Sequence, residues 1–149
     1  MGVDVSSTAE DYLRAIYEII TQKGFARIKD IARELEVTSS TVVEMMKKLD
    51  RNGFVKYEKY GGITLTDRGY EIALTIEKRH ETFKNLLEIL LVPKETALKD
   101  AHILEHQLHP TTILQFSRFL DFMTIHPEQP MCLQRWMVGF KKYCLRPES

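Results

Sequence analysis

The 149-residue sequence predicts a mostly α-helical protein. We expect an N-terminal winged helix-turn-helix with a small β-hairpin wing, joined by a long helix to an all-α second domain. Three observations predict this arrangement. Apolar residues recur at helical intervals along most of the chain. The period falls to two around Gly61-Gly62, which indicates a hairpin. Helical spacing then continues from Asp67 to about Leu91, and Pro93 ends it.

Three amphipathic helices precede the hairpin. The first follows Ser7 and Glu10, which have the spacing of a capping box, and Gly24 closes it. The second lies in ARIKDIARELEV, which places its apolar residues on one face. The third, in TSSTVVEMMKKLDRNGF, is entered through a cluster of Thr and Ser and ends at Asn52-Gly53. With the strands of FVKYEKYGGITLT, these helices form a winged helix-turn-helix over residues 1–66.

The third helix is the expected reader of DNA. Its apolar positions would fit a merely buried helix equally well, but its solvent face is polar and basic, and so is the hairpin. We expect Tyr57 and Tyr60 to pack within the wing. The residues expected to face the DNA groove are Ser39, Ser40, Thr41, Glu44 and Lys48. The candidates for phosphate contacts, any of which could instead be a solvated surface charge, are Arg27, Lys47, Lys56 and Lys59.

The second domain, residues 67–149, holds the long helix of about 67–91 and then shorter helices near 94–108, 111–123 and 131–144. Segments such as ILQFSRFLDFM and LQRWMVGF carry more apolar residues than one helical layer can hide. Pairing with a second copy would cover them, so we expect a homodimer.

Composition excludes some classes of protein. The 21 basic and 21 acidic residues balance, so DNA binding would depend on local placement and not on a strong overall field. No apolar run approaches the roughly 20 residues that span a bilayer, and we expect no membrane partner. Cys132 and Cys144 are too few for a disulfide framework and are expected to be free thiols. A cytoplasmic location is therefore expected.

The pentapeptide HILEH places His102, Glu105 and His106 on one helical face, where they could hold a divalent metal. H-x-x-E-H is also the spelling of inverted zinc peptidases, in which the glutamate activates water. A peptidase would need a further zinc ligand on a distant helix and a large catalytic chamber. The 149-residue chain offers neither a convincing acidic motif after His106 nor room for a substrate cleft, so we expect no enzyme.

The chain resembles the diphtheria toxin repressor family of metal-dependent transcriptional regulators, and is most similar to its short two-domain branch of manganese transport regulators. The resemblance runs from about Thr8 to His109. It is carried, in order, by AEDYLRAIY, IKDIARELEV, VVEMMKKLDRNGFV, YEKYGGITLT, DRG, KRHE and LEH. The last forty residues match only in helical character.

This resemblance implies a metal-activated regulator, most simply a repressor of metal-uptake genes. Its activating ion would be Mn²⁺ or Fe²⁺, with Zn²⁺, Co²⁺ or Ni²⁺ possible in vitro. Its partners would be a palindromic DNA operator and a second copy of the chain, with no small organic substrate. The metal ligands implied by the family pattern are Asp11, His80, His102, Glu105 and His106.

This chain departs from the family's metal-ligand pattern at two positions, Arg14 and His102, and these departures limit the predicted number of bound ions. Manganese members carry carboxylates where this chain has Arg14 and His102, and iron members carry methionine and cysteine where it has Asp11 and His102. We therefore predict one principal ion, with His80 peripheral or at a weaker second site. Two alternatives stay open: a winged-helix regulator that no longer responds to metal, and an H-x-x-E-H hydrolase. The ligands of the principal ion would be Asp11, His102, Glu105 and His106.

Overall fold

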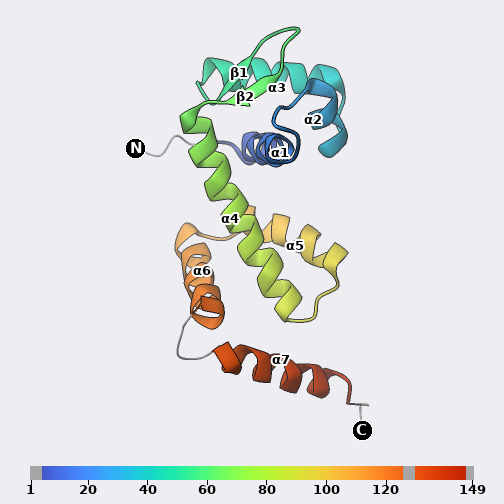
Figure 1. Cartoon of the computed structure of the whole chain (residues 1–149), viewed down its shortest axis with the longest axis vertical. Coiled ribbons are helices and arrows are strands. Elements are labelled where there is room, and N and C mark those ends of the chain that lie inside the picture. Colours follow the sequence, from blue (N-terminus) through green and yellow to red (C-terminus); the bar gives the residue numbers. More distant parts are fainter. Residues whose placement is uncertain (1–4, 126–129, 147–149) are drawn as a thin grey trace. The chain divides into compact units, whose positions relative to one another are not determined.

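The computed structural model describes the backbone of residues 5–125 and 130–146, and the side chains of these residues except 125 and 130–133. This part of the chain is mostly helical and contains one antiparallel pair of strands, which confirms the predicted fold class (Figure 1). It forms two compact units, Met1–Glu77 and Lys78–Ser149. The elements are α1 Ser7–Lys23, α2 Ile28–Glu34, α3 Ser39–Arg51, β1 Val55–Tyr57, β2 Ile63–Leu65, α4 Asp67–Ile89, α5 Lys94–Gln107, α6 Pro110–Ile125 and α7 Pro130–Cys144.

The N-cap of α1 is Ser6, so the predicted Ser7–Glu10 capping box is wrong by one position. The Ser6 side chain accepts a hydrogen bond from the backbone N–H of Ala9 at 3.3 Å. A capping box needs a Glu or Gln at the position of Ala9, whose side chain would accept from the backbone N–H of Ser6. Alanine has no such acceptor, so only the Ser6 side chain contributes a capping hydrogen bond. In this register the preceding Val5 packs against the core. The other end agrees with the prediction, because Gly24 adopts a left-handed conformation (φ 83°) that closes the helix.

Polar side chains also cap the next two helices. The carboxylate of Asp30 accepts from the Arg27 backbone N–H at 3.3 Å, at the start of α2. Thr38 Oγ1 accepts from the Thr41 backbone N–H at 3.3 Å, which confirms that the Thr/Ser cluster begins the third helix. Beyond α3, Gly53 takes a positive φ of 76° and turns the chain into β1.

The hairpin is confirmed, with Val55 opposite Leu65 and Tyr57 opposite Ile63. Residues 58–62 connect the strands, so the glycine pair lies at the end of the loop and not at its centre. Tyr57 packs against the core as expected. Tyr60 does not: it lies in the loop between the strands, and its side chain is 94% exposed.

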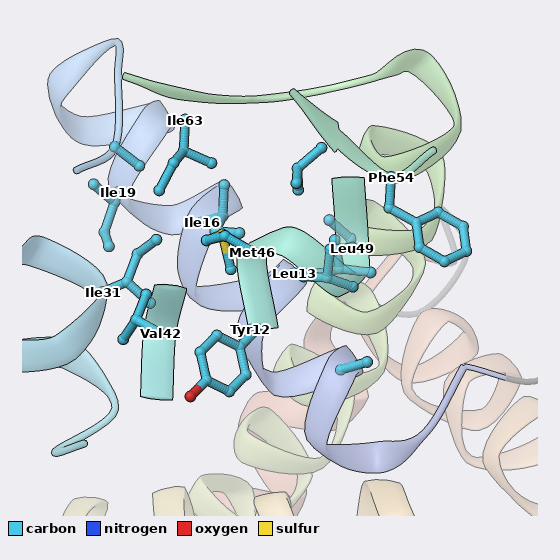
Figure 2. Packing of buried hydrophobic residues seen from close by; sticks show 14 of the residues in the cluster. Tyr12, Leu13, Ile16, Ile19, Ile31, Val42, Met46, Leu49, Phe54 and Ile63 are labelled. Carbon is cyan, nitrogen blue, oxygen red and sulfur yellow. The ribbon is translucent and has the colours of Figure 1, made fainter. Parts of the chain in front are cut away.

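The core of the first unit lies between α1, α2, α3 and the hairpin (Figure 2). Leu13 of α1, Ile31 of α2, Met46 of α3 and Ile63 of β2 are all fully buried. Burying each such side chain stabilises the fold by about 1.5–3 kcal/mol. The same packing leaves the opposite face of α3 in solvent.

The second unit contains the last part of α4 and the helices α5 to α7. The long helix stops at Ile89, two residues before its predicted end, and Leu91 has a positive φ of 63°. Phe83 is fully buried and meets Phe116 of α6 edge to face, with ring centroids 5.7 Å apart. The predicted helices near 94–108, 111–123 and 131–144 are confirmed, with ends shifted by a few residues.

Apolar side chains are prominent on the surface of α6 and α7, which contact each other. Phe119 is 50% exposed and Trp136 is 68% exposed. Cys144 is an exposed free thiol, as expected, and the Cys132 side chain lies outside the described residues. Among the described helices, none combines the length and apolar character required to cross a bilayer.

Candidate metal centre and nucleic-acid interface

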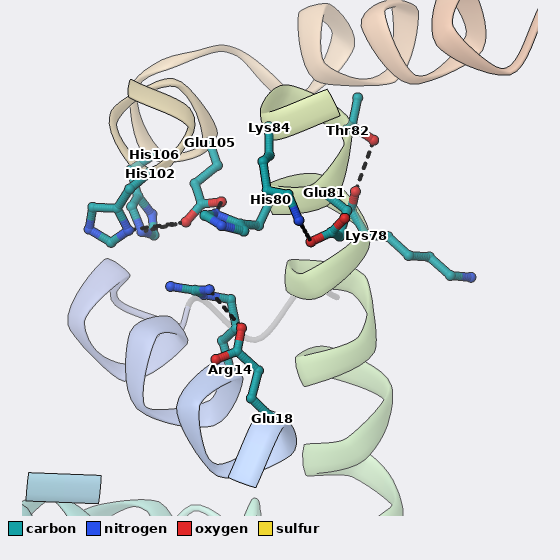
Figure 3. Close-up of polar contacts among 10 residues, drawn as sticks. All are labelled: Arg14, Glu18, Lys78, His80, Glu81, Thr82, Lys84, His102, Glu105 and His106. Carbon is teal, nitrogen blue, oxygen red and sulfur yellow. Dashed lines mark hydrogen bonds and ion pairs between the residues drawn. The ribbon is translucent and has the colours of Figure 1, made fainter. Parts of the chain in front are cut away.

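Three of the five residues of the HILEH motif, His102, Glu105 and His106, converge on one face of α5, and we call these three side chains the HILEH cluster (Figure 3). His102, Glu105 and His106 each offer a possible ligand atom, and these atoms lie within 4.8 Å of one another. The imidazole rings of His102 and His106 meet nearly edge to face, with centroids 4.9 Å apart. Helical spacing alone therefore assembles two nitrogen donors and one carboxylate.

Glu105 is buried because of where it lies on α5. Ala97, Ala101 and Glu105 are spaced four residues apart, and all three are buried. The alanines leave room for a neighbouring helix to approach, and His80 of α4 contacts the carboxylate. His80 Nδ1 lies 2.9 Å from Glu105 Oε2 in a hydrogen bond between two buried side chains. An ionised carboxylate can only accept, so this bond requires the hydrogen on Nδ1.

The second oxygen of the same carboxylate has a different environment. Glu105 Oε1 is buried and accepts no hydrogen bond within the described chain. It lies 3.3 Å from His102 Nδ1 and 3.5 Å from His106 Nε2, which are ion-pair distances without hydrogen-bond geometry. An unsatisfied buried carboxylate oxygen costs free energy. A cation shared with the two imidazole nitrogens would satisfy it, so this donor set fits a divalent transition metal.

Two other histidines of the second unit, of which only His80 was predicted as a ligand, lie outside the group formed by His102, Glu105 and His106. His80 is not a member of the mutually close set of ligand atoms, although it is bonded to Glu105. His109, which was not predicted as a ligand, is exposed, and its Nδ1 accepts from the Thr111 backbone N–H at 3.2 Å. Four of the predicted ligands, His80, His102, Glu105 and His106, thus belong to the second unit and lie on α4 and α5.

Asp11, the remaining predicted ligand, belongs to α1 in the first unit and is partly exposed. Arg14, one turn later, occupies the position where manganese members carry a second carboxylate. Its guanidinium donates to Glu18 Oε1 at 2.9 Å, within the same helix. Arg14 is therefore held along α1 by an (i, i+4) ion pair.

The predicted DNA-facing residues are all exposed, on α3, on the hairpin and just before α2. The hydroxyl of Thr38 bonds those of Ser40 (3.1 Å) and Thr41 (2.8 Å), which fixes the start of α3. Thr38 belongs to the predicted N-cap cluster but was not among the predicted DNA-facing residues. The exposed residues are Arg27, Ser39, Ser40, Thr41, Glu44, Lys47, Lys48, Lys56 and Lys59.

A groove of about 560 Å³ lies between the wing and residues 25–29, which include the start of α2. Arg27, Lys29 and Lys59 line it with Phe25 and Tyr60. The Arg27 guanidinium stacks over the Phe25 ring at 5.0 Å, and the Lys59 ammonium lies 5.6 Å from the Tyr60 ring centroid. Lys29 was not singled out from the sequence; its alternation with Arg27 in ARIKD was the available signal.

Two family models match the chain in succession. The first, iron dependent repressor, N-terminal DNA binding domain, matches residues 4–63. The second, iron dependent repressor, metal binding and dimerisation domain, matches residues 66–131. Together they cover both the winged helix-turn-helix and the helices that carry the HILEH cluster.

Individual relatives agree with these matches. The HTH-type transcriptional regulator MntR of Lysinibacillus sphaericus is 37% identical over 121 residues, which cover 81% of this chain and 85% of that protein. Two solved structures are also similar. The metal-dependent transcriptional regulator MtsR has a TM-score of 0.69 at 31% identity, covering 76% of this chain and 54% of that one. A manganese-dependent transcriptional repressor in complex with manganese has a TM-score of 0.67 at 29% identity, covering 76% and 53%. This chain spans about half the length of those solved chains.

Proposed function

The chain belongs to the iron dependent repressor family and is a metal-responsive DNA-binding repressor, and from this premise we propose that Mn²⁺ or Fe²⁺ activates it to repress metal-uptake genes. The observation that carries the proposal is the buried Oε1 of Glu105, which faces two imidazole nitrogens and accepts no hydrogen bond from the residues that the structure describes. In a regulator of this family, such a donor set is suited to sense a metal ion.

The proposed ligands are Asp11, His102, Glu105 and His106. Asp11 belongs to the proposed DNA-binding domain, residues 1–66, and the others to the proposed metal-binding and dimerisation domain, residues 67–149. A bound ion would supply a Lewis-acidic centre that bonds carboxylate and imidazole ligands from both domains at once. Ligands shared in this way favour one orientation of the two domains. The mixed nitrogen and oxygen set also admits Zn²⁺, Co²⁺ and Ni²⁺ in vitro.

We propose a single principal ion per subunit. Sites with two close cations need bridging carboxylates, and this chain has Arg14 and His102 at the positions where manganese members carry acids. A guanidinium beside a second cation would be repulsive. Arg14 also forms an ion pair with Glu18 of the same helix, at 2.9 Å.

Operator recognition is assigned to the exposed face of α3 and to the basic wing. A homodimer with two recognition helices would match a palindromic operator with half-sites about 34 Å apart. Glu44 can accept a hydrogen bond from cytosine N4 but cannot donate one, so it would favour cytosine at one position of each half-site. The groove beside the wing adds Lys29 to the candidate phosphate contacts.

The protein is not an enzyme, and we propose that it takes no small organic substrate. The glutamate of HILEH would serve as a ligand and not as a base. The absence of a membrane-spanning helix among the described residues is compatible with action on DNA in the cytoplasm, where we propose that it works.

The test is operator affinity measured at one fixed salt concentration, with chelator and then across a series of Mn²⁺, Fe²⁺, Co²⁺, Ni²⁺ and Zn²⁺. Fixed salt is essential because ionic strength alone changes DNA affinity strongly. We expect the affinity for the operator to rise at least tenfold with Mn²⁺ or Fe²⁺. Allosteric coupling between two sites is typically about 5–150-fold. Equal affinity with chelator and with every metal would support the alternative of a regulator that does not respond to metal.

A further inference from the structure

We propose that His80 is not a metal ligand but a positioning residue, which orients the carboxylate of Glu105 toward the ion bound by the HILEH cluster. This inference rests on the metal site of the proposed function. It assigns a distinct task to each oxygen of Glu105: Oε2 is held by His80, and Oε1 is left for the metal.

The geometry of the pair supports this division. His80 Nδ1 lies 2.9 Å from Glu105 Oε2, and the two side chains are only 6% and 0% exposed. The bond connects α4 with α5 across 25 positions of sequence, so helix packing determines it. Oε1 points instead toward His102 and His106, as Figure 3 shows.

The hydrogen bond also engages one of the two ring nitrogens of His80. An ionised Glu105 only accepts, so Nδ1 must carry the hydrogen and its lone pair is not available to a metal. Nε2 is the one nitrogen through which His80 could act as a ligand. His80 is absent from the set of ligand atoms that lie within 4.8 Å of one another, which contains His102, Glu105 and His106.

Orientation of a buried carboxylate affects metal affinity directly. Without a donor at Oε2, both oxygens of the buried Glu105 carboxylate would lack a hydrogen bond. The side chain would then turn toward another partner, and Oε1 would no longer face the two imidazoles. Removing a hydrogen-bond partner of a metal ligand typically weakens metal binding by about 10–100-fold. Such a loss alone would not distinguish a positioning residue from a ligand.

Two amide variants, each of which keeps a polar nitrogen near one of the two ring nitrogens, distinguish a positioning residue from a ligand. The amide nitrogen of asparagine occupies nearly the position of histidine Nδ1, so His80→Asn keeps the donor to Glu105 and removes Nε2. The longer glutamine places its amide near Nε2 instead, so His80→Gln removes the Nδ1 donor. Both are compared with His80→Ala by Mn²⁺ titration, and Co²⁺ absorption spectra report the ligand set.

We expect His80→Ala and His80→Gln to lower Mn²⁺ affinity by about 10–100-fold. His80→Asn should restore most of this loss and give a Co²⁺ spectrum like that of the wild type. If His80→Asn lost as much affinity as His80→Ala and changed the Co²⁺ spectrum, His80 would be a ligand and the inference would be overturned, with the proposed function intact. A wild-type protein that takes up no Mn²⁺ would instead overturn the proposed function and this inference together.

The wild-type chain provides a test that does not depend on folding of the variants. In protein loaded with cadmium, NMR couplings between the metal and histidine nitrogens identify bonded imidazoles. We expect couplings to His102 and His106, none to His80, and a protonated His80 Nδ1. A cadmium coupling to His80 would contradict the assignment.

Discussion

His102 Nδ1 lies 3.3 Å from Glu105 Oε1, one turn along α5, without forming a hydrogen bond. His106 Nε2 lies 3.5 Å from the same oxygen. The arrangement is that of three ligands directed at a common point, and it motivates the first two predictions.

Glu105→Gln distinguishes a ligand from a catalytic base. An amide oxygen is a far weaker ligand than a carboxylate, so we expect Mn²⁺ affinity to fall by at least about 100-fold, or about 2.7 kcal/mol. The metal-free protein should stay within about 1 kcal/mol of the wild type, because the glutamine oxygen can still accept from His80. Titration calorimetry and denaturant unfolding measure the two quantities. Metal retained in Glu105→Gln, with loss of a peptide hydrolysis present in the wild type, would instead support the hydrolase reading.

Asp11→Ala tests the coupling between the two domains. Three proposed ligands remain on α5, so some metal binding should persist, but the increase in operator affinity on adding Mn²⁺ should fall from at least tenfold to about twofold or less. Electrophoretic mobility shift at fixed salt measures this ratio. Glu71→Ala, which removes an exposed acid of α4 in the first unit, is the matched control and should retain the full response. A full metal response in Asp11→Ala would exclude Asp11 as the link.

Glu44→Gln should change which operators are bound. Glutamine donates and accepts, and pairs best with adenine, whereas glutamate accepts from cytosine. We expect a shift of about 1–3 kcal/mol in preference at one base pair of each half-site. Selection from randomised operators measures it. Lys47→Ala is the comparison. It should weaken binding to all operators alike and reduce the salt dependence of the binding affinity by the equivalent of about one phosphate contact. An unchanged base preference in Glu44→Gln would remove Glu44 from the reading face.

Gly69→Ala should destabilise the first unit. A Cβ atom at Gly69 would overlap the backbone carbonyl of Phe54, and that carbonyl already accepts from the Thr66 N–H at 3.1 Å. Backbone cannot move aside cheaply, so we expect a loss of about 1–3 kcal/mol or more in the free energy of unfolding. Gly139→Ala, on α7 with open space around it, should be neutral or stabilising by about 0.5–1 kcal/mol. Equal effects of the two substitutions on urea unfolding would contradict this packing.

Asp30 should make the stability of the first unit depend on pH. Its hydrogen bond with Lys23 lowers the pKa of the carboxyl below its ordinary value of 3.8. A lowered folded-state pKa stabilises the fold above pH 3.8, and the contribution is lost as pH falls through the folded-state pKa. Asp30→Asn should cost at most about 1 kcal/mol at neutral pH, since the pair is near the surface. The difference in the free energy of unfolding between Asp30→Asn and the wild type should vanish below the folded-state pKa of Asp30. A difference that persisted there would show that the ion pair is not its cause.

Local patterns were sufficient to predict much of the fold. The helices of the first domain, the hairpin and the convergence of His102, Glu105 and His106 all depend on spacing within a few residues. The choice of Ser6 over Ser7 as a cap could not be predicted, because both serines can cap and the packing of Val5 accompanies one register. The exposure of Tyr60 was missed for a similar reason, since residue spacing does not reveal whether a loop side chain packs or stays in solvent.

The bond between His80 and Glu105 was beyond sequence reasoning for a different reason. It joins residues on two helices and depends on how α4 and α5 pack, which no local pattern encodes. Family resemblance placed His80 among the ligands, and residue type alone cannot tell a histidine that binds a metal from one that holds a carboxylate. The 2.9 Å hydrogen bond between His80 Nδ1 and Glu105 Oε2 is the observation from which we propose the second role.

A crystal structure of the protein grown or soaked with excess Mn²⁺ tests the central proposal most directly. We expect one principal ion per subunit, bonded to Asp11, His102, Glu105 Oε1 and His106, with His80 donating to Glu105 Oε2 outside the coordination shell. An empty HILEH cluster at saturating Mn²⁺, or an occupied one with Asp11 directed into solvent, would contradict it.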